Sequence, residues 1–318
     1  MRDRRDGFWV GVWGVVLCLS PGCANPPPPA PVSAARPLTT QVDSLRGQGD
    51  RWVARGEYVR AGEAYEAARQ VAESLDDVKG RIGALNNLGW LALHRGATRE
   101  AMVLHGQAVT LAQQWGETDL LIGGLTALGA AEYQEGQKED AGRRYQQALE
   151  LLQQRPDVSA EAVLRNNLGL VRQATGDVGQ AEQLFREALA LNQASGSLEA
   201  EASNHVNLGI LAEERHEYDL AEREFERALE LDKAAVRRMD IAADLLRLSR
   251  IADRRGFPDQ ALAYSERAYR SYLAQGHRPQ AASALAVAVD CAKKLGRVQD
   301  IARLKKELDD LTPSRSSR

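Results

Sequence analysis

Small residues recur along the chain with a fixed spacing of 40 positions, and apolar residues between them follow the spacing of helix faces. In the last stretch, for example, Leu285, Ala288 and Ala292 lie three and four residues apart, as neighbours on one helix face do. Four registers keep the 40-residue period without an insertion, which indicates a repeated helical unit. The registers are Ala61, Ala101, Ala141, Ala181, Ala221 and Ala261; Gly49, Gly89, Gly129, Gly169 and Gly209; Gly56, Gly96, Gly136, Gly176, Gly256 and Gly296; and Ala68, Ala108, Ala148, Ala188, Ala228 and Ala268.

Each residue type in the unit has a physical reason, which the stretch 162–195 illustrates. Gly169 and Ala181 lack bulk, so two antiparallel helices can approach each other closely where they cross. Gly176 can adopt a positive φ without steric cost, and we expect it to end the first helix of the pair. Phe185 is expected to fill the notch that the small residues leave. The equivalent aromatic residues in other units are Tyr65, Tyr145 and Phe225.

The succession of Leu168-Gly169, Gly176, Ala181, Phe185 and Ala188 resembles the tetratricopeptide repeat. The resemblance covers residues 42–311 and implies an all-α fold, a right-handed superhelical solenoid of about seven antiparallel helix pairs. The expected units start at residues 42, 82, 122, 162, 202, 242 and 282.

The repeat has 40 residues, whereas the common unit of that family has about 34. We expect the additional residues to lengthen the second helix or the turn between units. With Asn-Asn-Leu-Gly at 86–89 and 166–169, the long unit is similar to that of kinesin light chains. The last unit, 282–311, loses its glycine and aromatic residue but keeps a polar outer side, which is typical of a terminal cap. Residues 312–318 are expected to form a disordered tail.

The first 22 residues have the organisation of an export signal. A basic start precedes the apolar stretch 8–19, which in a helix reaches about 18 Å, well short of the roughly 30 Å of a bilayer core. The segment resembles a bacterial lipoprotein signal peptide, which implies cleavage before Cys23 and acylation of its thiol. It departs from that pattern in having Leu19 four positions before the cysteine and Pro21 two before it. A plain secretory signal and a cytoplasmic protein are the alternatives.

Residues 23–41 are rich in proline and predict an extended tether. A polyproline II chain rises about 3 Å per residue, so this segment could span roughly 50 Å between a membrane surface and a folded body. Ala24 after the cysteine resembles the sorting signal of outer-membrane lipoproteins in Gram-negative bacteria. The expected location is therefore the periplasmic face of the outer membrane, with a soluble periplasmic or a cytoplasmic protein as alternatives.

The resemblance also implies that the first helix of each pair lines a concave groove. The sixth position of successive units reads Asn87, Asn167, Asn207 and Arg247, with Ala127 as an interruption. In arrays like those of kinesin light chains, asparagine at this place holds the backbone of an extended peptide, because its amide both donates and accepts. Each such bond contributes only about 0.5–1.5 kcal/mol, so affinity would come from the row. Alternatively, these asparagines cap turns or bridge neighbouring helices.

Further candidates for partner binding lie on the same helices. Trp90 and Tyr133 could serve as aromatic anchors, and ordinary packing between repeats is the alternative. The C-terminal end of the expected groove mixes acidic and basic residues, which favours a partner of mixed charge. The remaining candidates are Asn86, Asn166, Gln173, Glu213 and Arg250.

Charge and composition restrict the function further. The 318 residues include 41 Lys and Arg against 44 Asp and Glu, a net charge of −3, which argues against a nucleic-acid partner. Three cysteines exclude a disulfide framework, and His94 and His105 lack a third metal ligand. Cys291 falls in an apolar helix and is expected to be a small buried thiol. The glycines fit the structural period, so no phosphate-binding loop is indicated.

These observations predict no catalytic residues, cofactor, metal or small-molecule substrate. The expected function is a non-enzymatic scaffold, anchored to the outer membrane by lipid, that binds an extended or helical segment of a partner in envelope assembly, pilus formation or secretion. The alternative is a soluble regulator of the same repeat type that senses a peptide.

Overall fold

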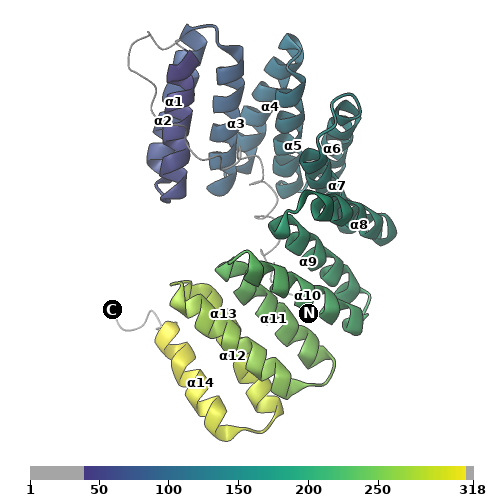
Figure 1. The fold of residues 1–318 in the computed structure, drawn as a ribbon. Helices are drawn as coiled ribbons and strands as arrows, with labels where there is room; N and C mark the ends of the chain where they lie inside the picture. The colour runs from purple at the N-terminus through teal and green to yellow at the C-terminus, as the bar shows by residue number, and fades with distance from the viewer. Residues whose placement is uncertain (1–38, 313–318) are drawn as a thin grey trace, which may run out of the picture. The chain divides into compact units, whose positions relative to one another are not determined.

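A computed structural model describes residues 39–312, and all the regular elements in this range are α-helices (Figure 1). The predicted leader 1–22, Cys23 and most of the predicted tether lie outside the described residues, as does the tail after Thr312. The helices are α1 (Thr39–Ala54), α2 (Tyr58–Ser74), α3 (Val78–His94), α4 (Thr98–Trp115), α5 (Thr118–Gln134), α6 (Lys138–Leu152), α7 (Val158–Ala174), α8 (Val178–Ser195), α9 (Leu198–Glu214), α10 (Tyr218–Ala234), α11 (Arg238–Arg254), α12 (Pro258–Ala274), α13 (Arg278–Lys294) and α14 (Val298–Leu311).

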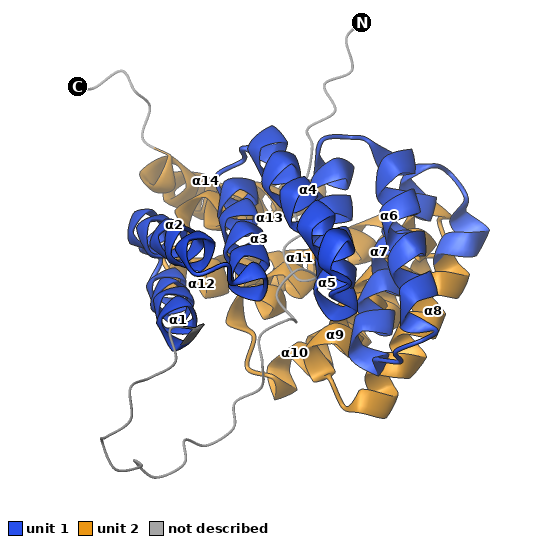
Figure 2. Ribbon diagram, turned by 90° about the horizontal axis from the view of Figure 1, so that it is seen from above, with its two compact units in different colours: residues 1–181 blue, residues 182–318 orange. Residues whose placement is uncertain are grey.

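The chain divides into two compact units, Met1–Ala181 and Glu182–Arg318 (Figure 2). In the first unit, each helix from α1 to α7 packs against the next, and the first helices of adjacent pairs also touch, as α1 and α3 do. In the second unit, the helices from α9 to α14 pack in the same successive order. Within each unit, the helix pairs thus bury their apolar faces against their neighbours in the chain, which confirms the predicted helix pairs.

The aromatic side chain of a pair packs into the notch at the glycine of its first helix. A Cβ added at Gly209 would lie 2.6 Å from the ring of Phe225, so a larger residue does not fit there without a shift. His105 occupies the aromatic position of the second pair, where a Cβ at Gly89 would also meet its ring at 2.6 Å. The same arrangement joins Gly49 to Tyr65 and Gly129 to Tyr145. The predicted notch is therefore confirmed, with a histidine in one of its places.

Residues with a positive φ end the helices. Gly176 follows α7 with a φ of +87°, as predicted, and His216 stands at the equivalent place after α9 with a φ of +60°. A second set of residues with a positive φ lies in the turns between pairs. Asp76 and Val236 have a positive φ there without being glycine. Their glycine counterparts are Gly116, Gly196 and Gly276.

The helix pairs start earlier than the predicted units. The second pair begins at Val78 rather than at 82, because the Asp77 carboxylate accepts a hydrogen bond from Gly80 N at 2.9 Å and caps the helix. Most of the described helices have 17 residues, and turns of two or three residues join them. Of the two alternatives, longer helices rather than longer turns therefore accommodate the additional residues of the unit at all but one described place.

That exception is the turn between α6 and α7. Helix α6 has 15 residues, and the segment 153–157 separates it from α7. Pro156 stands in the register of Gly116 and Gly196. Proline is fixed at a φ near −65° and cannot adopt the positive φ that closes the other turns. The helix therefore ends earlier, and a wider turn replaces the tight one.

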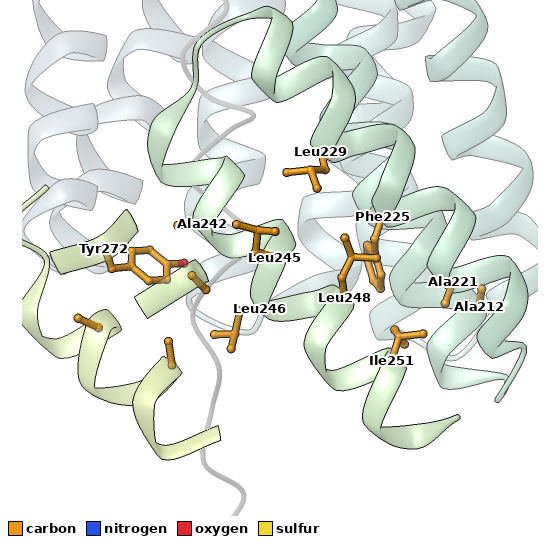
Figure 3. Close-up of a cluster of buried hydrophobic side chains, with 13 residues drawn as sticks. Ala212, Ala221, Phe225, Leu229, Ala242, Leu245, Leu246, Leu248, Ile251 and Tyr272 are labelled. Atoms are coloured by element: carbon orange, nitrogen blue, oxygen red, sulfur yellow. The ribbon is translucent and has the colours of Figure 1, made fainter. Parts of the chain in front are cut away.

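Buried apolar side chains form the core of the second unit (Figure 3). Phe225 of α10 is fully buried and belongs to one cluster with Leu248 and Ile251 of α11. The next cluster ends on Leu304 of α14, while Lys305 on the same helix is exposed. This polar outer side agrees with the predicted terminal cap. None of the described helices combines the length and the apolar character needed to cross a bilayer.

Candidate partner-binding site

Asn86 and Asn87 of α3 bond to neighbouring helices. Asn86 Oδ1 lies 3.1 Å from His105 Nδ1 on α4. Asn87 Nδ2 donates over a long 3.5 Å to Asp50 Oδ1 on α1, and the Tyr65 hydroxyl donates to the same oxygen at 2.7 Å. Both asparagines are half-buried. These contacts agree with the alternative interpretation, in which asparagines bridge helices.

The rest of the predicted row is largely covered. Asn167 of α7, Asn207 of α9 and Arg247 of α11 are buried, and so is Asn166 next to the first of them. A buried amide presents little polar surface to an extended peptide. The row as a binding ladder stays a prediction, and the burial of its members favours a structural role.

Three of the predicted residues in the first unit keep part of their surface exposed. Trp90 of α3, Tyr133 of α5 and Gln173 of α7 are half-buried. The Trp90 ring stacks on His94 with centroids 5.3 Å apart and an interplanar angle of 16°. Burial raises the pKa of Tyr133 above its usual value. The two aromatic residues thus take part in packing and still offer an apolar edge.

Three arginines follow one face of α11 in the second unit. Arg247, Arg250 and Arg254 lie three and four residues apart, and we call them the arginine row. Arg247 Nη1 donates to Asp244 Oδ1 at 2.7 Å. Burial lowers the pKa of Arg250, and the carboxylate of Glu213 on α9 opposes that shift. Arg254 is exposed, so the row runs from a buried, paired end to a solvated one.

Two groups of polar residues escaped the sequence analysis. Asp232 and Asp244 form a buried pair between α10 and α11. Their positions are 40 residues after Asn192 and Asn204, which donate and accept one hydrogen bond at 2.6 Å. The available signal was a pair of polar residues at positions where the other repeats carry Ala, Gly, Leu or Tyr. The second case is the buried place of His105 against Gly89. Burial lowers the pKa of His105 to about 4 and keeps the ring neutral.

The described residues offer few groups for metal or thiol chemistry. No set of three or more His, Cys, Asp or Glu side chains within residues 39–312 could hold a metal ion. Cys291 is buried and free, as predicted, and burial raises the pKa of its thiol to about 11. A thiol of that kind is protonated at neutral pH and is a poor nucleophile.

The sequence profile of the tetratricopeptide repeat matches residues 121–194 and again residues 159–234. Residues 121–234 of this chain are tetratricopeptide repeats. The helix pairs of this repeat extend on both sides of the matched range at the same 40-residue period. A search of curated proteins gives no match to the sequence.

Solved structures of other repeat arrays share the fold. A Rap protein complexed with Competence and Sporulation Factor is 15% identical, with a TM-score of 0.62 over 86% of this chain and 75% of that one. Kinesin-light-chain-like repeats from Podospora anserina are 15% identical, with a TM-score of 0.51 over 63% and 99%. Aspartyl phosphate phosphatase F from Bacillus subtilis is 11% identical, with a TM-score of 0.64 over 87% and 72%. At these identities the likeness establishes the fold alone.

Proposed function

We propose that this tetratricopeptide repeat protein is a non-enzymatic binding protein that holds one segment of a protein or peptide partner against the first helices of its pairs. The arginine row on α11 is the observation that carries the proposal. At its inner end the side chain of Arg247 is fixed by Asp244, and at its outer end Arg254 is exposed to a partner. Preordered side chains lose less entropy when a partner binds.

The chemistry of the row favours a partner with acidic groups beside basic or neutral ones. Arg254 offers an exposed guanidinium, whereas Glu213 and the exposed Glu214 on α9 would repel a uniformly acidic segment. A mixed segment is also what the sequence analysis favours.

Reversal of the charge at position 254 tests this proposal. We expect Arg254→Glu to weaken the capture of the partner in crosslinked membranes by at least tenfold, because one attractive contact becomes a repulsive one. Arg223→Glu is the matched control, since Arg223 is exposed on the second helix α10 and undergoes the same change of charge. Equal losses in the two variants, or no loss in either, would place binding elsewhere. Replacing Asn167 or Asn207 is a weaker test because both are buried.

The anchor is a separate part of the proposal. The cysteine at position 23, after a short apolar stretch and before a proline-rich segment, supports acylation and a tether at the outer membrane. We expect globomycin, which blocks lipoprotein signal cleavage, to cause the larger precursor to accumulate. We also expect Cys23→Ser to release the chain from the membrane fraction. An unchanged size together with a soluble wild-type chain would contradict anchoring.

A soluble peptide sensor is the second candidate function. The likeness to the Rap protein solved with Competence and Sporulation Factor favours it. This function predicts a soluble chain in which a short peptide changes the fluorescence of Trp90 when Trp9, Trp13, Trp52 and Trp115 are replaced by Phe. Because one of the similar folds is named a phosphatase, the purified chain should also be assayed for phosphate release from acetyl phosphate, where we expect none.

A further inference from the structure

Asp232 of α10 and Asp244 of α11 meet where the fifth and sixth helix pairs join. Both side chains are buried, and the two carboxyl groups lie close enough for the charge of Asp232 to raise the pKa of Asp244. An ionised carboxylate can only accept, so a hydrogen bond between the two groups needs a proton on one of them. Asp244 Oδ2 is buried and receives no hydrogen bond from the described residues. One proton between the two carboxyl groups would supply the missing donor.

The same two positions in other repeats show what is unusual here. Asn192 Nδ2 donates to Asn204 Oδ1 at 2.6 Å one repeat earlier, and that amide pair supplies its own donor. The aspartates occupy the same two positions, but a carboxyl pair can form such a bond only with a proton from solution. The remaining junctions carry Ala72 with Ala84, Ala112 with Gly124, Leu152 with Leu164, and Tyr272 with Ala284.

Two arginines hold the pair from its outer sides. Arg237, in the turn between the helices, donates to Asp232 Oδ1 at 3.2 Å. Arg247 donates to Asp244 Oδ1 at 2.7 Å. The other groups that face the pair are the Asp240 carboxylate on α11, the Tyr272 hydroxyl on α12 and the backbone oxygen of Glu199 on α9, which accepts from Arg237.

The direction of the pH effect follows from these surroundings. Burial raises the pKa of both carboxyl groups, although Arg237 opposes the shift at Asp232 and Arg247 opposes it at Asp244. In the unfolded chain both groups ionise near pH 4. Between that pH and the raised pKa values the folded state binds more protons, so its stability falls as the pH rises.

The turn at the same junction is strained. Val236 has a φ of +57°, which is unfavourable for a β-branched residue. Its side chain is 68% exposed, so packing of the side chain does not compensate for the cost of this backbone conformation. Strained backbone persists only where its surroundings hold it, and it is common at elements that move. The strained turn and the carboxyl pair therefore lie at the same junction, between α10 and α11.

We propose that the α10–α11 junction is a proton-sensitive joint, closed while Asp232 and Asp244 share a proton and loosened when that proton is lost. Because Arg247 belongs to the arginine row, opening of the joint would also displace the row, and this consequence rests on the proposed function. The joint itself does not, and it can be tested without a partner.

Hydrogen exchange of α10 and α11 between pH 5 and pH 8 tests the joint. After correction for the intrinsic exchange rate, we expect protection in the wild-type chain to fall by up to tenfold per pH unit for one proton. Asp232→Asn should remove this dependence and raise protection at pH 8, because its amide can donate to Asp244 as Asn192 donates to Asn204. Glu230→Gln is the matched control: it removes an exposed carboxylate on α10 that does not face the pair, and it should leave the pH dependence in place.

Flat protection in the wild-type chain, or equal flattening by the two variants, would overturn the proposal. If Asp232→Asn fails to fold by circular dichroism, the carboxyl carbons of the wild-type chain can be titrated by NMR. We expect two aspartate signals to be coupled and at least one to titrate well above the usual carboxyl range. Titration of every aspartate below pH 5 would also overturn it.

Discussion

Two side chains stand at positions where the other repeats carry a better-suited residue. Val236 occupies a turn position that Gly116, Gly196 and Gly276 fill with a positive φ. His105 occupies an aromatic position in the core. Both positions are set by the period of the repeat, so the environment stays the same while the residue differs. The effect on stability of replacing either side chain by the common residue can therefore be predicted from the equivalent positions of the other repeats.

Val236→Gly should stabilise the second unit. A left-handed conformation costs an L-residue about 1–2 kcal/mol, and the entropy of glycine in the unfolded chain returns about half of that. We expect a net gain of about 1 kcal/mol in the free energy of unfolding, measured by urea denaturation followed by circular dichroism. Val59→Gly, at an exposed position inside α2, should destabilise instead. A loss of stability in the first variant would contradict the assigned strain.

His105→Phe should make the stability of the first unit less sensitive to acid than it is in the wild-type chain. The pKa of His105 is about 4 when folded and about 6.5 when unfolded, so the unfolded state binds more protons between these values. Stability is therefore lost as the pH falls from 6.5 to 4, by on the order of 3 kcal/mol. The free energy of unfolding of the phenylalanine variant should fall less over that pH range. Urea unfolding followed by tryptophan fluorescence measures this, because Trp52, Trp90 and Trp115 lie in the first unit.

At the scale of the element, helix length follows from the residue that comes after the helix. Most turns are closed by a residue with positive φ, and the adjoining helices reach 17 residues. Pro156 removes that option, and α6 ends at 15 residues. Helix α14 is shorter still, with 14 residues, and its exposed side chains, such as Lys305, leave one of its faces polar.

Leu304→Ala should weaken the terminal cap. Leu304 is fully buried and packs in one cluster with Leu285 and Cys291. Removing such a side chain leaves a cavity and costs roughly 2–5 kcal/mol. We expect α14 to detach first, seen as faster hydrogen exchange of α13 and α14. Lys305→Ala, an exposed neighbour, is the control and should change protection little; the same loss in both variants would show that the cap does not depend on this packing.

At the scale of the whole molecule, the two compact units carry buried titratable groups of opposite effect. His105 in the first unit destabilises it in acid, while the Asp232–Asp244 pair in the second unit destabilises it toward higher pH. The pair is held by charges from α10, α11 and their turn, whereas His105 has only a neutral hydrogen bond to Asn86. The two contributions therefore offset each other in any measurement that averages over the chain.

Local probes should separate the two contributions. We expect the difference between wild-type and His105→Phe, measured by tryptophan fluorescence, to grow as the pH falls. The difference between wild-type and Asp232→Asn, measured by hydrogen exchange of α10 and α11, should grow as the pH rises. Differences that change in the same direction would contradict the assignment of at least one group.

The sequence by itself determined the helix pairs, their period, the glycine notches and the terminal cap, because spacing along a helix fixes which residues share a face. It also placed Gly176 at a helix end, since only a few residues tolerate that φ. Tertiary structure decided where the helices begin and which inner residues are covered, as the burial of Asn167 and Asn207 shows. It also brought Asp232 against Asp244. Burial and pairing depend on how two helices pack across a turn, and no spacing within one helix encodes that.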